Sequence, residues 1–435
     1  MSAKGGPDHP IVVDPGSSRF FELPADVSLV ESSAGSPGAT YPAGFVAAGV
    51  VGGLKDSGRP DMGVLAVAPE SRSAVSSAAL FTTNAFAAAP VRVNKAECDL
   101  DHILAVAMNS GNANACTGEQ GMQVARAMQR ACAEVLGIPT ASVAVGSTGI
   151  IGVPLDEGTL AAGIARAAKA VVPGGGPDFE ASVMTTDRFP KMCALDVPTV
   201  DGLVHLGVCA KGAGMISPAM ATMLCVVTTD AALSPGDAAL LLKNATGKTF
   251  NRITVDGEMS TNDSVFFIAS GASGVSLSPA GMARLGAALD AMLLRIALMM
   301  VADGEGATKI VRLVVAGAPD EATAVYVARA VANSPLVKTA MHGGDPNWGR
   351  VISAAGAAMR GKLLPRASLF LGGVKVVQDA AAFPVPEDQS VKMHAEMKEP
   401  ELDIHLDLGE GRASFEIFFS DMGHEYITIN AEYHT

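Results

Sequence analysis

The segment KGAGMISPAMATMLCVVTTD, from Lys211 to Asp230, contains the residue types best suited to chemistry. A lysine lies among glycines, and the pair Ala221-Thr222 precedes an apolar run. A threonine hydroxyl becomes an effective nucleophile when a nearby base removes its proton. Self-cleavage before Thr222 would create such a base, because the new N-terminal α-amine would have a pKa of about 8. The segment therefore predicts cleavage between Ala221 and Thr222, followed by acyl transfer on Thr222.

A second glycine-rich segment, the GSTGIIG loop from Gly146 to Gly152, could assist the same chemistry. Acyl transfer passes through a tetrahedral oxyanion, which fixed hydrogen-bond donors must stabilise. The hydroxyl of Thr148 and the backbone N–H of Gly149 are two suitable donors. Taken alone, this loop could be an ordinary turn, and an isolated Ala-Thr pair is usually the junction of a loop and a strand. The two segments together favour the catalytic interpretation.

Other side chains have the chemistry to bind a substrate. The Thr185 hydroxyl can hydrogen-bond a carboxylate, and Lys211 offers a cation that could also lower the pKa of a neighbouring amine. A lysine is usually a solvated surface residue, which is the alternative for Lys211. Asp303 and Glu305 lie in a DGEG turn, where one of them could bind a substrate ammonium group. The alternative is a helix end with solvated carboxylates.

The regular pattern of the C-terminus continues to Thr435, which predicts that Asn430 and Thr435 contact the substrate. Two polar segments, 109–114 and 257–264, are dense in side chains that hydrogen-bond their own backbone, so we expect structured turns near the site. The segment 343–350 holds the only tryptophan of the chain and is interpreted as a packed turn that supports the fold, with a binding role as the alternative.

Composition limits the class of protein. The chain has 435 residues, of which 49% are hydrophobic and 17% charged, as in folded globular proteins of two or three domains. Its net charge of −13, with no basic stripe, argues against a nucleic-acid partner. The six cysteines show neither a Cys-x-x-Cys pair nor zinc-ligand spacing. We therefore expect buried free thiols and no metal site.

The N-terminus lacks an apolar signal core and an Arg-rich amphipathic pattern, which predicts a cytoplasmic protein. The mitochondrial matrix or the chloroplast is the alternative if a presequence is missing from this sequence. The most apolar long run, 282–302, is interrupted by Arg284, Asp290 and Arg295. Because charges are costly inside a bilayer, we expect a buried helix and no membrane partner.

Three helices are predicted from periodicity and capping residues. Residues 122–136 place apolar side chains on one face and end at Gly137. Ser234 precedes Pro235 and has an acid three positions later, which is typical of a helix start. Asp320 is the predicted cap of a further helix that runs to residue 333.

Strands are predicted where apolar and polar residues alternate or β-branched residues gather. Residues 402–408 alternate, which indicates a strand with one buried face. Residues 310–315 are predicted to form a further strand, and residues 414–420 and 426–433 are predicted to extend the sheet that contains 402–408. Mixed helices and strands predict an α/β or α+β protein.

We divide the chain into three parts. Residues 1–40, rich in Gly, Pro and Ser, are predicted to be a flexible arm. Residues 41–308 form the predicted catalytic domain with the self-cleavage site. Residues 309–435 form a smaller C-terminal α/β domain that contributes to the substrate pocket.

Eight motifs along the chain, taken in order, resemble the ornithine acetyltransferase family. The resemblance covers residues 44–435, and the ordered set is far more specific than any single motif. The motifs are NSGNANACTGEQG from Asn109, GSTGIIG from Gly146, MTTD from Met184, the interrupted motif KGAGM…MATML from Lys211, TVDGEMSTNDS from Thr254, DGEGAT from Asp303, GDPNWGR from Gly344 and INAEYHT from Ile429.

The resemblance implies a self-processing enzyme with sheets stacked between helices, like the self-processing aminopeptidases. It implies cleavage between Ala221 and Thr222 and an acetyl-enzyme on Thr222, with Thr148 and Gly149 as the oxyanion hole. It also implies a pocket formed by six residues. These are Thr185, Lys211, Thr222, Glu305, Asn430 and Thr435.

The implied reaction is a ping-pong transfer of acetyl from N-acetylornithine to glutamate in arginine biosynthesis. No cofactor is implied, although acetyl-CoA is a possible second acetyl donor, and the implied assembly is an α2β2 heterotetramer of the cleaved chains. Two alternatives are kept. One is an amidase or aminopeptidase that uses the same N-terminal threonine with water as acceptor, and the other is a non-catalytic binding protein.

Overall fold

The computed structural model describes residues 18–31, 37–217 and 223–432. Its contacts divide the chain into two compact units. The larger unit comprises Phe21–Met300 with Asn430–Thr435, and the C-terminal unit comprises Val301–Ile429 with Met1–Phe20. The boundary between the units, after Met300, lies a few residues before the predicted domain boundary at 308/309. The functional division into domains stays a prediction.

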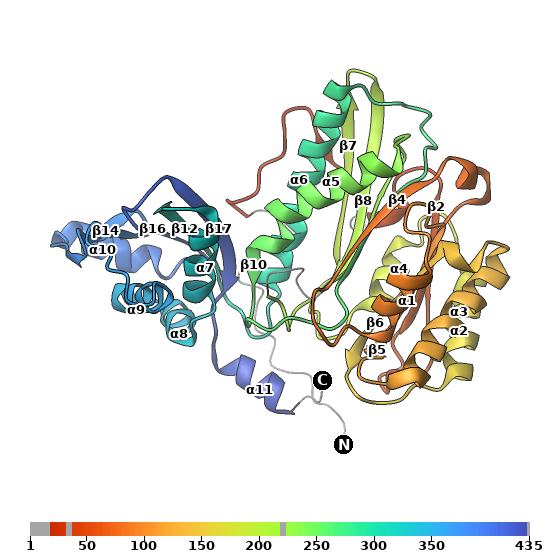
Figure 1. The fold of residues 1–435 in the computed structure, drawn as a ribbon, viewed down its shortest axis with the longest axis horizontal. Coiled ribbons are helices and arrows are strands. Elements are labelled where there is room, and N and C mark those ends of the chain that lie inside the picture. The colour runs from red at the N-terminus through yellow and green to blue at the C-terminus, as the bar shows by residue number, and fades with distance from the viewer. Residues whose placement is uncertain (1–17, 32–36, 218–222, 433–435) are drawn as a thin grey trace. The chain divides into compact units, whose positions relative to one another are not determined.

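The larger unit contains two β-sheets and the helices that cover them (Figure 1). Its strands are β1 (Ser28–Leu29), β2 (Phe45–Val50), β3 (Met62–Val67), β4 (Ser76–Phe81), β5 (Ala105–Asn112), β6 (Val143–Ile150), β7 (Lys191–Thr199), β8 (Gly202–Lys211), β9 (Leu224–Thr229), β10 (Ile253–Thr254) and β11 (Ser264–Ala269). Its helices are α1 (Ala89–Glu97), α2 (Gly118–Leu136), α3 (Glu157–Ala170), α4 (Gly176–Val183), α5 (Pro235–Lys248) and α6 (Pro279–Ala302), whose last residues belong to the other unit.

The two sheets pack against each other through a shared apolar core. The six-stranded sheet has the order β1-β7-β8-β9-β11-β4, and the four-stranded sheet has the order β2-β3-β5-β6. Leu65 and Val106 of the four-stranded sheet belong to the same buried cluster as Val226 and Phe266 of the six-stranded sheet. Helices α2 and α3 cover the four-stranded sheet, and α5 packs on β4 and β11. The predicted α/β fold with sheets stacked between helices is therefore confirmed.

The C-terminal unit has its own sheet and its own core. Its strands β12 (Ile310–Ala318), β13 (Ser368–Leu371), β14 (Val374–Gln378), β15 (Ala381–Ala382), β16 (Glu401–Asp407) and β17 (Ala413–Ser420) lie in the order β17-β12-β16-β13-β14-β15. Its helices are α7 (Glu321–Ala332), α8 (Pro335–Gly343), α9 (Trp348–Ala358) and α10 (Glu387–Glu396), and α11 (His424–Glu432) follows. Strand β12 pairs parallel with β16 and antiparallel with β17, and α7 packs on β12 and β17.

The predicted helix ends are confirmed because they depend on local hydrogen bonds. Helix α2 begins one turn before the predicted residue 122 and ends at Gly137, whose φ of 62° is left-handed. The Ser234 side chain accepts a hydrogen bond from the backbone N–H of Asp237 at the start of α5. Asp320 caps α7 in the same way, through the N–H of Thr323.

The strands predicted at 310–315, 402–408 and 414–420 are confirmed as β12, β16 and β17, whereas the strand predicted at 426–433 is wrong. That region lies in helix α11 as far as Glu432. β-Branched residues favour strands mainly by packing on a half-buried pleated face. Ile427 is 66% exposed, so this packing is not available and local helical hydrogen bonds decide the conformation.

Of the predicted flexible arm, residues 18–31 and 37–40 are described and make defined contacts, while the division of the chain into this arm and two domains stays a prediction. In the C-terminal unit, Arg19 forms ion pairs with Glu396 and Asp403, and its backbone N–H donates to Glu401 Oε2 at 2.9 Å. In the larger unit, β1 pairs antiparallel with β7. These contacts join residues far apart in sequence, so local composition could not reveal them.

Helix α6 contains the long apolar run. It is long and apolar enough by composition to cross a membrane, but 72% of its most apolar window is buried, as in the core helix of a folded protein. The expected buried helix is confirmed.

All six cysteines are free thiols, as expected, but their burial is not uniform. Cys116 is exposed, which corrects the expectation that all are buried, and Cys98 is partly exposed. Cys116 has a left-handed φ of 56° in the turn before α2, which lies at the surface of the unit.

Candidate active site

Thr148 and Gly149 lie near the end of strand β6, and not in the loop predicted from the glycine pattern. Strand β6 pairs parallel with β5, which places Gly149 opposite Gly111. Gly149 has a φ of 131°, and a Cβ atom added to it would lie 2.3 Å from the carbonyl carbon of Gly111. Because no side chain fits there, the backbone at Gly149 can adopt this conformation only as glycine.

Lys211 is the last residue of strand β8, so it is not carried by a flexible glycine loop. Its side chain is only 4% exposed, which excludes the solvated surface lysine that was the alternative. Its Nζ donates a hydrogen bond of 3.3 Å to Thr148 Oγ1. Since β6 and β8 belong to different sheets, this bond marks a point where the ends of the two stacked sheets meet.

The strand that follows the predicted cleavage site begins beside Lys211. Strand β9 pairs antiparallel with β8 and places Leu224 opposite Lys211. The backbone N–H of Met223 donates to Asp263 Oδ1 at 3.0 Å. Ala221 and Thr222 lie outside the described residues, but Thr222 is bonded covalently to Met223.

A buried carboxylate connects Thr185 to the end of strand β8. Asp187 Oδ2 accepts from the backbone N–H of Thr185 at 2.9 Å, and its Oδ1 accepts from the N–H of Gly212 at 2.7 Å. The same Oδ1 accepts from Lys191 Nζ at 2.7 Å. Thr185 therefore lies close to the residue that follows Lys211.

The structure thus brings together four of the predicted residues: Thr148, Gly149, Thr185 and Lys211. Glu305 lies mostly buried in the turn after α6, in the C-terminal unit, and Asn430 is exposed near the end of α11. Thr435 lies outside the described residues. The site roles of all these residues stay predictions.

Comparison with known proteins identifies a family that covers nearly the whole chain, including these site residues. The ArgJ family matches residues 46–435. The chain belongs to the ArgJ family. This confirms the resemblance found from the eight motifs.

Curated relatives of this ArgJ-family chain are similar over nearly their full length. The arginine biosynthesis bifunctional protein ArgJ of Nitratidesulfovibrio vulgaris is 41% identical over 393 residues, covering 90% of this chain and 98% of the relative. The protein of the same name from Symbiobacterium thermophilum is 42% identical over 403 residues, covering 92% and 98%. The crystal structure of ornithine acetyltransferase complexed with ornithine from Mycobacterium tuberculosis is 34% identical, covers 46% of this chain and 100% of that chain, and has a TM-score of 0.39.

Two buried charged residues near the site of this ArgJ-family protein, Asp187 and Lys191, are not predicted from the sequence. Burial alone would raise the pKa of the Asp187 carboxyl, but the ammonium groups of Lys191 and Lys211 outweigh it and hold that pKa well below its usual value. Asp187 and Lys191 are both fully buried, so this ion pair is internal. Asp187 belongs to the MTTD motif, but nothing in the local pattern predicts that it is buried.

Two further carboxyl groups near the site have raised pKa values. Burial raises the pKa of Glu180 to about 8, even though its Oε1 accepts from the backbone N–H of Lys191 at 3.0 Å. Burial also raises the pKa of Asp263 well above its usual value. Within the described part of the chain, Glu180 Oε2 and Asp263 Oδ2 have no hydrogen-bond partner. Both groups are therefore expected to retain a proton more readily than ordinary carboxylates.

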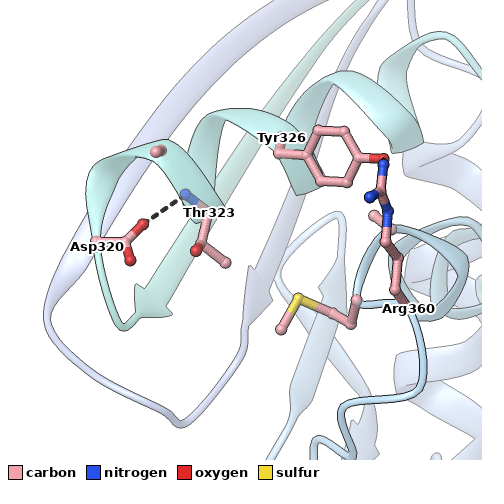
Figure 2. Close-up of a pocket in the computed structure, with 7 residues that line it drawn as sticks. Asp320, Thr323, Tyr326 and Arg360 are labelled. Atoms are coloured by element: carbon pink, nitrogen blue, oxygen red, sulfur yellow. Dashed lines mark hydrogen bonds between the residues drawn. The ribbon is translucent and has the colours of Figure 1, made fainter.

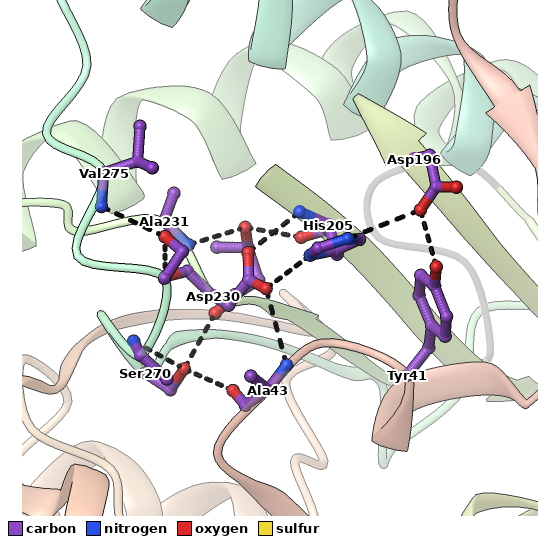
Figure 3. Close-up of polar contacts among 11 residues, drawn as sticks. Tyr41, Ala43, Asp196, His205, Asp230, Ala231, Ser270 and Val275 are labelled. Carbon is purple, nitrogen blue, oxygen red and sulfur yellow. Dashed lines mark hydrogen bonds and ion pairs between the residues drawn. The ribbon is translucent and has the colours of Figure 1, made fainter. Parts of the chain in front are cut away.

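Two other features of this ArgJ-family protein contain none of the predicted site residues. One is a shallow hollow of about 580 Å³ in the C-terminal unit, whose lining residues are drawn in Figure 2. Arg360 donates there to the Tyr326 hydroxyl, and Asp320 caps α7. Figure 3 shows His205 between two carboxylates. Its Nδ1 lies 2.6 Å from Asp230 Oδ2, and its Nε2 lies 3.5 Å from Asp196 Oδ1.

The contacts of His205 are structural in character. Its partners lie on β7 and just after β9, so the ring joins neighbouring strands of one sheet. Tyr41 donates to Asp196 Oδ1 at 2.6 Å, and burial together with this carboxylate raises the pKa of Tyr41 to about 12. Among the described residues, no group of three His, Cys, Asp or Glu side chains could hold a metal ion.

Proposed function

We propose that this protein is a self-cleaving acetyltransferase of arginine biosynthesis, which moves acetyl from N-acetylornithine to glutamate. The proposal is supported by the arginine biosynthesis bifunctional proteins that it resembles and by the ornithine complex of a similar enzyme. The observation that carries it is the hydrogen bond from Lys211 to Thr148. It joins a cation and an oxyanion donor beside the strand that begins two residues after Thr222.

Self-cleavage begins with attack of Thr222 Oγ1 on the carbonyl carbon of Ala221. The tetrahedral intermediate breaks its carbon–nitrogen bond, which leaves an ester on Thr222 and a free α-amine. Water then hydrolyses this ester and releases the carboxylate of Ala221. The α-amine of Thr222 becomes the base for later turnovers.

Acetyl transfer then proceeds in two half-reactions. The Thr222 hydroxyl attacks the acetyl carbonyl of N-acetylornithine, the α-amine takes the hydroxyl proton, and this proton passes to the departing ornithine amine. The amine of glutamate then attacks the acetyl ester and restores Thr222. Both amino acids share the α-carboxylate, for which Lys211 and the Thr185 hydroxyl are suitable partners.

Thr148 and the N–H of Gly149 are the proposed oxyanion donors in both half-reactions. Thr148 Oγ1 accepts a hydrogen bond from Lys211, so its own hydroxyl proton remains available to donate. Lys211 thereby orients Thr148 as well as supplying charge. Fixed donors of this kind stabilise a developing oxyanion without reorganising during the reaction.

Four finer features also belong to the proposal. Acetyl-CoA serves as a second acetyl donor, which is supported by the word bifunctional in the names of the relatives. The cleaved chains assemble as an α2β2 heterotetramer, and the protein is located in the cytoplasm. Glu305, Asn430 and Thr435 complete the substrate pocket, with Glu305 facing the cationic group of ornithine.

Replacing Thr222 with Ala tests the self-cleavage. We expect Thr222→Ala to remain one chain of about 44.1 kDa by intact-mass spectrometry, whereas the wild type gives two fragments. Thr222→Ser is the matched control, because it keeps a hydroxyl nucleophile and should still be cut. Two fragments from Thr222→Ala would contradict the proposal.

Ornithine release with and without glutamate distinguishes transfer from hydrolysis. A transferase releases ornithine continuously from N-acetylornithine only when glutamate accepts the acetyl group. An amidase with the same nucleophile would release ornithine equally well without glutamate, and that result would contradict the assigned reaction.

A further inference from the structure

A rigid loop after strand β2 lies next to the candidate active site. Residues 52–55 wrap around the buried carboxylate of Asp61, which immediately precedes β3. The backbone N–H groups of Gly52, Gly53, Leu54 and Lys55 all donate to this carboxylate, the last three at 3.0, 2.6 and 3.0 Å. Four donors on one buried anion fix the loop conformation, so the position of Lys55 is preorganised.

The loop passes over Gly111, which lies opposite Gly149 of the predicted oxyanion hole. A Cβ atom added to Gly111 would lie 3.4 Å from both Lys55 Cγ and the carbonyl oxygen of Leu54. Gly111 in turn lies directly against Gly149. The Lys55 side chain therefore runs along the backbone of Gly111, the β5 neighbour of the residue that carries the proposed oxyanion donor.

The Lys55 ammonium group ends beside a second part of the site. Its Nζ donates to the carbonyl oxygens of Met184 at 2.8 Å and Pro60 at 2.9 Å. Met184 immediately precedes Thr185, a proposed carboxylate partner. An ammonium group has three donors, and within the described residues the third has no acceptor.

Four charged side chains act on Lys55. Burial lowers its pKa to about 8, Asp61 and Asp187 oppose this shift, and Lys211 and Arg59 add to it. With this pKa Lys55 is mainly protonated at neutral pH, and a bound anion favours its charged form whereas a bound cation disfavours it. The two amino-acid substrates of the proposed reaction differ in the charge of their side chains, which is negative in glutamate and positive in ornithine.

We propose that Lys55 is a specificity-determining residue that binds the side-chain carboxylate of the acidic acceptor. This inference rests on the proposed function. Lys211 and Thr185 suit the α-carboxylate, and Lys55 supplies a separate donor for the second carboxylate. Asp61 acts as a positioning residue, because it holds the loop that carries Lys55.

The test compares Lys55→Met with Lys55→Arg in the self-cleaved enzyme. Glutamate and its neutral analogue glutamine are used as acceptors for the acetylated enzyme. Loss of a charge-assisted hydrogen bond in Lys55→Met is expected to raise KM for glutamate about tenfold or more, with little change for glutamine. Ornithine release in the first half-reaction is expected to change less than about threefold. Lys55→Arg should keep the preference for glutamate.

Arg59→Met is the matched control, because it removes the same charge from an exposed side chain a few residues further along the loop. An equal loss of glutamate preference in Arg59→Met and Lys55→Met would overturn the specific role of Lys55. An unchanged KM for glutamate in Lys55→Met would also overturn it. Self-cleavage of each variant reports that the fold is intact.

The pH dependence gives a second readout. In the wild type, KM for glutamate should rise as pH increases through about 8, because Lys55 loses its proton. In Lys55→Arg this rise should be absent, because arginine stays protonated throughout this range. Identical pH profiles in both proteins would overturn the proposal.

Direct binding separates this inference from the proposed function. Calorimetry of glutamate with the cleaved wild type and Lys55→Met is expected to show binding at least about tenfold weaker in the variant. Equal binding would overturn the role of Lys55 whatever the reaction is. Glutamate binding without any acetyl transfer by the wild type would overturn the proposed function alone.

Discussion

At the scale of single residues, Thr148 shows how one side chain can serve two partners. Its hydroxyl oxygen accepts from Lys211, and its hydroxyl proton is free to donate to an oxyanion. Thr148 is 9% exposed, so this donor acts where water screens it little.

We expect Thr148→Ala to lower kcat about a hundredfold, which is typical for the loss of one oxyanion donor. The measurement is steady-state acetyl transfer from N-acetylornithine to glutamate. Thr148→Ser keeps the hydroxyl and should retain most of the activity. Turnover of Thr148→Ala equal to that of the wild type would remove Thr148 from the oxyanion hole.

At the scale of elements, the site depends on charges buried between α4 and strands β7 and β8. Glu180 of α4 accepts a hydrogen bond from the backbone N–H of Lys191, the first residue of β7. Asp187, which lies between α4 and β7, accepts from both Lys191 Nζ and the N–H of Gly212, the residue after β8. Asp187 is balanced by Lys191, which leaves the charge of Lys211 available to an anionic substrate. The interior of the unit therefore holds Lys211 and Thr185 in place.

Glu180 makes the stability of the larger unit depend on pH. Burial raises its pKa from 4.5 to about 8, so between these values the folded state retains a proton that the unfolded state has lost. The free energy of unfolding contributed by this group must therefore fall as pH rises from 4.5 to about 8, and stay constant above. The upper limit of this loss is about 5 kcal/mol, since one pKa unit corresponds to about 1.4 kcal/mol.

We expect Glu180→Gln to remove this contribution, because the amide has a similar shape and does not ionise. Chemical denaturation of the wild type and the variant at pH 5 and pH 8 measures it. The loss of stability between the two pH values should be smaller in Glu180→Gln. The same loss in both proteins would show that Glu180 is already ionised in the folded state at neutral pH.

At the scale of the whole molecule, the proposed cut lies in the chain between β8 and β9, two neighbouring strands of the six-stranded sheet. Strands β9 and β11 follow the cleavage site, yet in the six-stranded sheet they lie between β8 and β4, which precede it. Strand β9 pairs with β8, and β11 pairs with β4 along six residue pairs. The backbone hydrogen bonds and the shared core are independent of the peptide bond between Ala221 and Thr222.

We therefore expect the two fragments to stay associated after cleavage. Native mass spectrometry of the wild type should show no free fragment, while a denaturing gel shows two bands. The proposed α2β2 assembly predicts a native mass of about 88 kDa, twice the 44.1 kDa of one chain. Separate fragments in native solution would contradict the association, and a native mass of about 44 kDa would contradict the heterotetramer alone.

Much of the secondary structure could be predicted because its causes lie within a few residues. Ser234 and Asp320 cap helices through the N–H three positions later, and the alternation at 402–408 matches a strand with one buried face. The strand predicted at 426–433 failed because β-branched residues need a neighbouring pleated surface, which local sequence does not supply.

The sequence by itself determined the family, the capped helices and the residue types that could carry acyl transfer, since these depend on local order along the chain. Only the tertiary structure decided that Thr148, Thr185 and Lys211 meet, and that Lys55 lies beside them. These residues come from separate strands, loops and sheets, and their approach depends on strand register and on which charges become buried. These contacts depend on the packing of the whole chain, because the two residues of each contact lie far apart in the sequence.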